Sequence, residues 1–363
     1  MANKRVIDDI AADVANVSQL ATDAEIARLR SELASFKGRY KAALNQIDAE
    51  RERADTIAGL SGIKSVRPAL TKSVKGRKHQ ATVIVALSDW HTEELVREET
   101  VNGLNAFDLD ICERRIGELS ERFATLLEHE RQLVQVDRVV VWLGGDFITG
   151  HIHEDCAELA QKAPLAAMRW AGERIQGFLD MVAGMAKEVI VATSSGNHGR
   201  SNHGKIRVGT ELDHSFEQNA YLTMAADERR KNVRWQVSGG YLNCLDLDGF
   251  RVRFHHGHAL IYNGGVGGIA IGAAKAIAAW DKIEPADLTV FGHYHQFSWL
   301  RAGRYVSNGS LIGHSAYAVK IKATYEPPCQ AFIVVDHGRR EVTKALPIFC
   351  DRDLQQRRAD AAK

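Results

Sequence analysis

The stretch VIVALSDWHTEEL, residues 83–95, joins an apolar run to a carboxylate and an imidazole. Its first five residues are continuously apolar, which is typical of a strand covered on both faces. Asp89 and His91 follow directly and stand two residues apart. In an α/β sheet, ligands bind at the carboxyl ends of the strands. The stretch therefore predicts a buried strand that ends at the edge of a sheet. Two side chains that can bind a metal follow it there.

Short apolar runs alternate with amphipathic segments through most of the chain. Residues 138–145 and 188–195 have the pattern of further buried strands, and each is preceded by a segment with helical periodicity, 108–135 and 164–186. After residue 234 the pattern changes to alternating strands. This order predicts an α/β sandwich with strands in the middle and helices outside.

The composition is that of an ordinary globular protein. Lys and Arg (47) nearly balance Asp and Glu (46), so the net charge neither favours nor excludes a nucleic-acid partner. The five cysteines are dispersed and form no CxxC pair, which argues against a disulfide framework or a thiolate zinc site. A reducing compartment, the cytoplasm, is therefore expected. No uncharged apolar run reaches ~18 residues, so we expect no membrane span.

The N-terminal residues 1–60 form a distinct helical segment. From Ile26 to Ile47, apolar residues recur at alternating steps of three and four, the spacing of a coiled-coil seam. The segment is either a helix that lies on the rest of the chain or a coiled coil that forms a homo-oligomer through residues 22–50. Residues 61–80 follow with six cations and no acid, as a solvated linker or as a contact with a phosphate backbone.

Four later strand ends carry side chains of the same kind as the first. The motifs are GD, GNH, HHG and GHYH, with candidate residues Asp146, Asn197, His198, His256, His293 and His295. All are oxygen or imidazole donors suited to a divalent transition metal. In the third motif the strand alternation turns His256 inward, and His258 remains the alternative. Each motif alone would be weak, but five in this order indicate a metal centre.

The two-residue spacing within two of these motifs has a proposed physical reason. Residues i and i+2 of a regular strand point to the same side. Asp89 and His91 are therefore expected to face one point, and His293 and His295 another.

In this order the motifs resemble those of the calcineurin-like metallophosphoesterases, over about residues 80–340. The resemblance implies a four-layer α/β/β/α sandwich and two divalent metal ions, manganese first, with iron or zinc as alternatives. It places the first metal on Asp89, His91, Asp146 and His295. It places the second on Asp146, Asn197, His256 and His293, with Asp146 bridging. A metal-bridging hydroxide would attack the phosphoester, and His198 would protonate or stabilise the departing oxygen.

The wording SDWH at residues 88–91 resembles the DNA-repair nuclease branch of this family. The basic linker and a cationic loop point the same way, and cations beside such a site suit phosphate. The candidate substrate contacts in this loop are Arg200, His203 and Arg207. We therefore expect phosphodiesters of nucleic acid as substrate. The alternatives are a phosphomonoesterase or small-nucleotide phosphodiesterase, and a non-catalytic scaffold that binds partners through residues 1–60.

Two positions depart from the family pattern. An acid usually follows the GNH histidine, but here Gly199 stands there, so another residue or a water must orient His198, or this ring is less constrained. The second motif commonly reads GDxxD, but here it ends in Thr149, and the GDxxDRG of protein serine/threonine phosphatases is absent. Directly afterwards, His151 and His153 either contact the substrate or lie in a solvated loop.

The predicted organisation has four segments. They are a helical appendage at 1–60, a basic linker at 61–80, a metallophosphoesterase catalytic domain at 81–345 and a C-terminal tail at 346–363.

Overall fold

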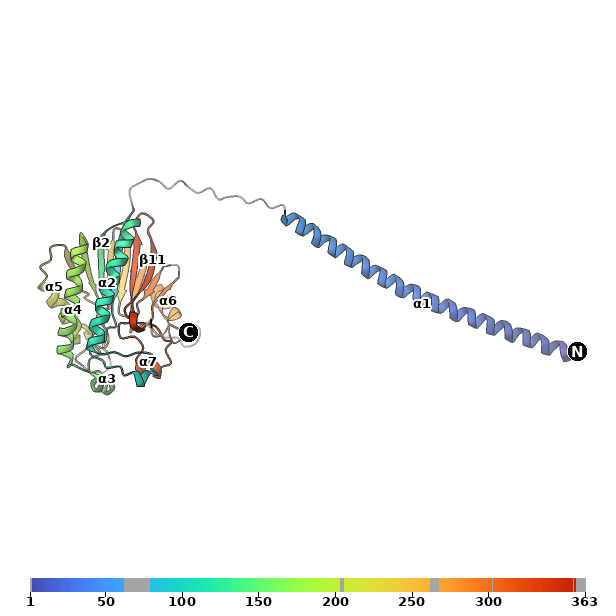
Figure 1. Cartoon of the computed structure of the whole chain (residues 1–363), viewed down its shortest axis with the longest axis horizontal. Helices are drawn as coiled ribbons and strands as arrows, with labels where there is room; N and C mark the ends of the chain where they lie inside the picture. Colours follow the sequence, from blue (N-terminus) through green and yellow to red (C-terminus); the bar gives the residue numbers. More distant parts are fainter. Residues whose placement is uncertain are drawn as a thin grey trace. The chain divides into compact units, whose positions relative to one another are not determined.

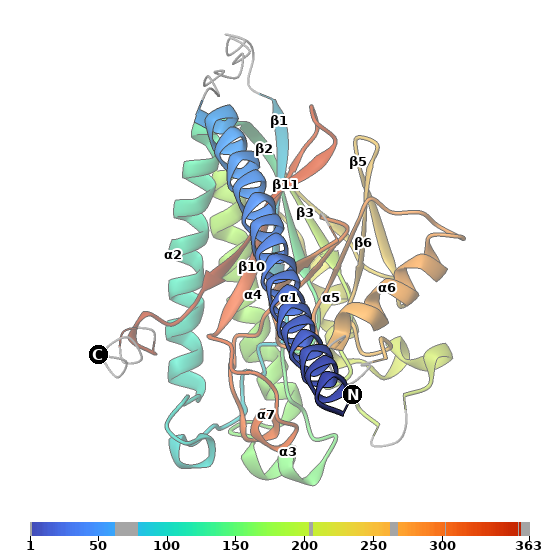
Figure 2. The same cartoon turned by 90° about the vertical axis from the view of Figure 1, so that its right-hand side faces the viewer.

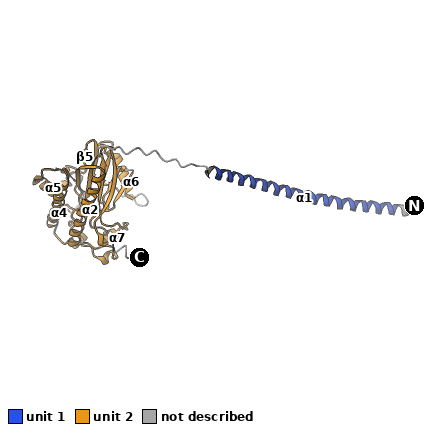
Figure 3. Ribbon diagram, turned by 45° about the horizontal axis from the view of Figure 1, so that its top comes forward, with its two compact units in different colours: residues 1–75 blue, residues 76–363 orange. Residues whose placement is uncertain are grey.

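The computed structural model describes residues 2–61, 79–202, 206–261, 268–301, 303–354 and 356. The chain divides into two compact units, Met1–Lys75 and Gly76–Lys363 (Figure 3). In the first unit, the described residues form one helix, α1 (Ala2–Ser61). The second unit contains both sheets. Nearly all of the predicted basic linker lies outside the described residues, and so does His203.

One sheet has, among the described residues, six strands in the order β11-β10-β1-β2-β3-β4. Strands β1 to β4 are parallel, whereas β10 runs antiparallel to β1 and to β11. The bounds are β1 Gln80–Leu87, β2 Gln135–Leu143, β3 Glu188–Thr193, β4 Val233–Gln236, β10 Cys329–Asp336 and β11 Glu341–Phe349. Along β1, Val83 and Val85 join the core under the helices, while Ile84 and Ala86 join the core under the other sheet. Both faces are covered, which explains the unbroken apolar run.

The other sheet has five strands within the described part of the chain, in the order β5-β6-β7-β9-β8. Strands β6, β7 and β9 are parallel, and the edge strands β5 and β8 are antiparallel to their neighbours. The bounds are β5 Asn243–Leu247, β6 Phe250–His255, β7 Leu288–Phe291, β8 Ser298–Leu300 and β9 Tyr305–Ser307. Trp142 of β2 stacks on Phe254 of β6 with ring centroids 5.8 Å apart, so the two sheets pack face to face.

Helices form the outer layers. Figures 1 and 2 show α2 (Leu109–Leu133) and α4 (Pro164–Met185) on one side of the strands and α6 (Gly268–Trp280) on the other. Helix α2 begins at a cap in which the Asp108 carboxylate accepts a hydrogen bond from the Ile111 amide at 2.7 Å. The layers confirm the predicted four-layer α/β/β/α fold class with its N-terminal helix.

Several short elements escape the sequence pattern. Helices α3 (Glu154–Leu159), α5 (Phe216–Ala226) and α7 (Ala316–Lys320) have too few turns for a clear period, and strand β8 has only three residues. Strand β11 continues past residue 345, the predicted end of the catalytic domain, to Phe349. Among the described helices, none combines the length and the apolarity needed to cross a membrane.

Candidate metal centre

The candidate ligands lie just beyond the strand ends, in a backbone of unusual conformation. Five of them have φ angles in the left-handed region: Asp89 (57°), His91 (49°), Asp146 (53°), His293 (71°) and His295 (54°). Such a conformation costs a non-glycine residue on the order of 1 kcal/mol or more, and it clusters at functional sites. The surrounding packing must therefore hold these loops in place.

The predicted reason for the two-residue spacing is wrong. Strand β1 ends at Leu87, before Asp89 and His91, so these two residues do not lie on a regular strand. Left-handed turns direct their side chains instead of strand alternation. His293 and His295 follow the end of β7 in the same way.

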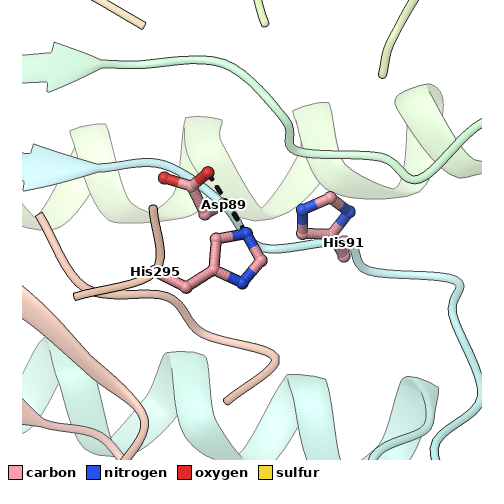
Figure 4. Close-up of side chains that lie close together, drawn as sticks. All are labelled: Asp89, His91 and His295. Atoms are coloured by element: carbon pink, nitrogen blue, oxygen red, sulfur yellow. Dashed lines mark ion pairs between the residues drawn. The ribbon is translucent and has the colours of Figure 1, made fainter. Parts of the chain in front are cut away.

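The first group of candidate ligands consists of Asp89, His91 and His295, whose ligand atoms lie within 4.8 Å of one another (Figure 4). The His295 Nε2 is 3.4 Å from the Asp89 Oδ1. His91 is buried, and its Nε2 has no hydrogen-bond partner among the described residues. Burial and the neighbouring His198 hold the pKa of His91 well below its ordinary value. A neutral, unpartnered imidazole nitrogen of this kind is available to a metal ion.

The second group consists of Asp146, His256 and His293. The His256 Nε2 lies 2.9 Å from the Asp146 Oδ2 and 3.2 Å from the Asn197 Oδ1. Its Nδ1 is 2.7 Å from the Gly144 carbonyl, which can only accept, so Nδ1 carries a proton. Burial lowers the pKa of His256, but the Asp146 carboxylate raises it to about 10. A divalent cation would replace the Nε2 proton as the partner of this carboxylate.

Asp146 connects the two groups, because its carboxylate also clusters with His91 and His198. The donor set contains carboxylate, amide and imidazole groups and no thiolate, which suits divalent transition metals. The unpartnered His91 nitrogen fits the same conclusion, since burying such a group without a partner costs about 1–3 kcal/mol. The residues therefore fit two metal ions, and the assignment of each residue to one ion stays a prediction.

Glycines allow the loops to approach one another at this edge. A Cβ at Gly196 would overlap the Asp146 carboxylate, and a Cβ at Gly292 would overlap that of Asp89. The amide of His198 donates to Asp146 Oδ1 at 2.8 Å, and the amide of His293 donates to Asp89 Oδ1 at 3.0 Å. Backbone amides thus fix both carboxylates.

Thr149 holds two of the histidines. Its carbonyl is 3.0 Å from the His198 Nδ1, so that nitrogen donates and Nε2 is left to face the centre. Its hydroxyl is 2.9 Å from the His91 Nδ1 and donates to the Glu94 carboxylate at 2.8 Å. Thr149 therefore orients His198, although Gly199 follows the GNH motif.

Glu217 fills the space beside Gly199. A Cβ at Gly199 would lie 2.8 Å from the Glu217 Cγ, which explains why glycine stands there. The Glu217 carboxyl accepts from the amides of Phe147 at 2.8 Å and Gly196 at 2.7 Å. Burial and the nearby Asp146 raise the pKa of Glu217 to about 8. In the sequence, the only sign of the Glu217 carboxyl is that position 199, where an acid is expected, holds glycine.

Glu93, like Glu217, is a buried carboxyl group that accepts hydrogen bonds from backbone amides. It accepts from the amides of Thr149 at 3.1 Å and Gly150 at 2.8 Å, and burial raises the pKa of this carboxyl to about 7. Sequence reasoning overlooked Glu93 and Glu94 although both belong to the stretch that opens the fold.

The predicted substrate contacts that the structure describes, Arg200 and Arg207, differ in their exposure to solvent. Arg200 is half-buried next to the GNH motif, and its Nε has no hydrogen-bond partner among the described residues. Arg207 is exposed. His258 pairs with Glu211 at 2.8 Å, so the structure places His256 rather than His258 in the ligand cluster. Glu211 also lines a neighbouring cavity of about 180 Å³.

The residues that carry the nuclease resemblance have supporting positions. Trp90 is buried and packs edge-on against Phe147 with ring centroids 4.8 Å apart. Ser88 donates to the Asp89 carboxylate and accepts from the Asn308 amide at 2.9 Å. Both residues support the ligand loop, and their positions say nothing about the substrate.

Comparisons with known proteins give low similarity. No family model and no curated protein matches the chain. Among solved structures, the chain is similar to Vps29 from Entamoeba histolytica complexed with zinc (12% identity, TM-score 0.31, 73% of this chain and 99% of that one). It is also similar to a predicted phosphoesterase from Streptococcus pneumoniae (13%, 0.30, 74% and 98%) and to an archaeal phosphodiesterase (13%, 0.31, 73% and 99%).

Two features of the chain itself identify its fold. Two face-to-face sheets lie between helical layers, and the five ligand motifs meet in their expected order at the strand ends. The chain therefore has the four-layer α/β/β/α fold that its resemblance to the calcineurin-like metallophosphoesterases implies.

Proposed function

We propose that this protein is a metal-dependent phosphoesterase that hydrolyses phosphodiester bonds of nucleic acid. The observation that carries the proposal is the Asp146 carboxylate, which belongs to two adjoining clusters of candidate ligands and lies beside His198. Two bound cations, for which we propose manganese, would supply Lewis-acid activation of the phosphate and of the attacking water.

The chain's own residues supply the proton. His198 stands outside the two groups that the resemblance assigns to the metals, and Thr149 fixes its Nδ1. Its Nε2 is then the atom that gives a proton to the departing oxygen. Water attacks phosphorus, the bond from phosphorus to the leaving oxygen breaks, and the products are a phosphomonoester and an alcohol. The attacking water releases one proton to solvent, and solvent returns a proton to His198 after the step.

The cations beside the GNH motif support an anionic substrate. The amide of Arg200 donates to the His198 carbonyl at 2.8 Å, so the arginine is tied to the loop of the proposed acid. Its unpartnered Nε could donate to a phosphate oxygen, a charge-assisted hydrogen bond. Nucleic acid is favoured over a small nucleotide by the basic residues of the linker and of this loop.

A substrate panel tests the proposal. The full chain is stripped of metal, supplied with manganese and incubated with linear and circular DNA, RNA, a generic phosphodiester and a generic phosphomonoester. Asp146→Asn serves as the blank, and Asp155→Asn, an exposed acid on α3, is the matched control. We expect cleavage of nucleic acid and of the diester by the native chain and by Asp155→Asn only.

Two results would contradict the proposal. Cleavage of monoesters alone would refute the nuclease assignment. Activity that survives both chelation and Asp146→Asn would refute the metal-dependent mechanism.

A pair of variants tests the proposed substrate contact. Arg200→Ala should raise KM, whereas Arg169→Ala on the exposed face of α4 should leave KM unchanged.

A further inference from the structure

Helix α1 exposes a long row of apolar side chains. Every α1 residue whose side chain is described is exposed, including Val17 at 67% and Phe36 at 59%. A single helix in water gains most of its stability from an apolar face packed on a partner. Large apolar side chains in such a row are a sign of an interaction surface.

The row consists of two seams. The first seam is Ile7, Ile10, Val14, Val17 and Ala21, and the second runs from Ile26 to Ile47. Within each seam the steps alternate between three and four residues, as in coiled coils. The step from Ala21 to Ile26 is five residues, which breaks the pattern and divides the helix into two halves.

The two halves carry opposite charges. Residues 7–24 contain four acids (Asp8, Asp9, Asp13 and Asp23) and no base, which gives −4. Residues 26–43 contain five bases (Arg28, Arg30, Lys37, Arg39 and Lys41) and one acid (Glu32), which gives +4. A parallel pair of such helices would place like charges together, whereas an antiparallel pair places acid against base.

We infer that α1 pairs with α1 of a second copy of this chain in an antiparallel coiled coil. The register opposes residues whose numbers sum to 50, so that the acidic half of each copy faces the basic half of the other. This inference does not depend on the proposed catalytic function.

Side-chain sizes support the same register. The opposed pairs of the seams are Ile7 with Ala43, Ile10 with Tyr40, Val14 with Phe36, Val17 with Leu33 and Ala21 with Leu29. Ile26 faces Ala24 and Ile47 faces position 3, both of which lie outside the seams. Every alanine of the seams faces a large residue. Each aromatic side chain faces an aliphatic side chain. Alternation of large and small residues across a seam allows close packing. In a parallel pair, alanine would face alanine and leave gaps.

Neighbouring registers lose this match. A shift by one heptad opposes residues 7–24 to residues 19–36, with two bases and three acids, or to residues 33–50, with three bases and two acids. The opposed charges are then −1 or +1 instead of +4. Because the seam moves around the helix between Ala21 and Ile26, the two copies change contact faces at the centre of the pair, near Glu25.

Cysteine cross-linking of the full chain tests the orientation. In the inferred register, Val14 of one copy lies opposite Phe36 of the other, while the two Val14 residues are 22 positions apart, about 33 Å along the helix. After oxidation, the double variant Val14→Cys/Phe36→Cys should run as a cross-linked dimer. So should an equal mixture of the two single variants. Each single variant alone, and the native chain with its own five cysteines, should not. Cross-linking of each single variant alone would overturn the antiparallel orientation.

Charge reversal tests the electrostatic basis. The native chain of 40.1 kDa should show twice that mass in light scattering. Lysine at positions 8, 9, 13 and 23 should halve the mass, because both halves then carry +4. A second variant that also has glutamate at positions 28, 30, 37 and 39 should restore the double mass, because the halves become +4 and −4. A monomeric native chain, or a first variant that stays dimeric, would overturn the inference.

Discussion

The candidate metal centre and helix α1 both depart from the usual pattern of burial, in which charged groups are exposed and apolar groups are buried. The centre buries charged groups, whereas α1 exposes apolar ones. At the centre, the carboxylates of Asp89 and Asp146 are almost fully buried. On α1, large apolar side chains such as Phe36 are exposed. Charges are rarely buried unless they are paired or bind metals, and long apolar rows are rarely left in water. Buried carboxylates at the candidate centre call for a cation, and the exposed apolar row of α1 calls for a packing partner.

Removal of one buried charge should break the metal centre, with the largest expected effect. Asp146→Asn deletes the carboxylate that joins both ligand groups, and we expect activity to fall by about 10³-fold, the upper range for loss of one key electrostatic group. Titration calorimetry with manganese should also show fewer bound ions. Unchanged stoichiometry would mean that Asp146 is no ligand, and Asp155→Asn controls for the loss of an acid as such.

A buried charge that is already paired within the chain should respond differently. Arg115 Nε donates to Asp351 at 2.9 Å, and both side chains are almost completely buried. Asp351→Asn should lower the free energy of unfolding of the second unit by about 3–5 kcal/mol, with metal affinity unchanged. Urea unfolding monitored by tryptophan fluorescence measures the loss.

The same pair predicts a dependence on pH. Burial raises the pKa of Asp351, but Arg115, with help from the Leu354 amide and the Arg114 charge, lowers it below its ordinary 3.8. The pair therefore stabilises the fold fully above about pH 4 and loses this contribution as the pH falls through the lowered pKa. Acid unfolding of the native chain should be steeper than that of Asp351→Asn, and equal curves would show that the pair contributes nothing.

The support behind the ligands should have an intermediate effect. Thr149→Val keeps the shape of the side chain but removes the hydroxyl between His91 and Glu94. Loss of such a supporting hydrogen bond typically costs 10–100-fold in metal affinity or activity, and we expect about that range for manganese affinity. Thr149→Ser should restore most of it. If valine and serine behave alike, the hydroxyl does not orient His91.

A pair of matched truncations gives the sharpest contrast, and its α1 member has the smallest expected effect. Leu119→Ala, on the buried face of α2, should destabilise the second unit by about 2–5 kcal/mol. Leu33→Ala, on α1, should leave the melting of that unit within about 0.5 kcal/mol of the native chain. Differential scanning calorimetry of both variants measures the melting of the second unit. If Leu33→Ala destabilises that unit, α1 packs on it.

Sequence reasoning reached the strands and the candidate ligands that the structure brings together, because both leave local patterns. Apolar runs predict the buried strands, and the motifs stand directly after them. The supports of the site are different in kind. Glu217 meets Gly199 only because α5 packs under the ligand loops, and Thr149 reaches Glu94 across 55 positions. Contacts between distant segments have no period or spacing, so the sequence offered only the missing acid at position 199 as a sign.

The left-handed backbone at five candidate ligands has a consequence for metal choice. Among residues with a side chain, asparagine, aspartate and histidine adopt this conformation several times more readily than most others, and β-branched residues rarely do. The five positions hold only aspartate and histidine. The turns thus admit aspartate and histidine at low cost, and these oxygen and imidazole donors suit ions that accept hard or borderline ligands.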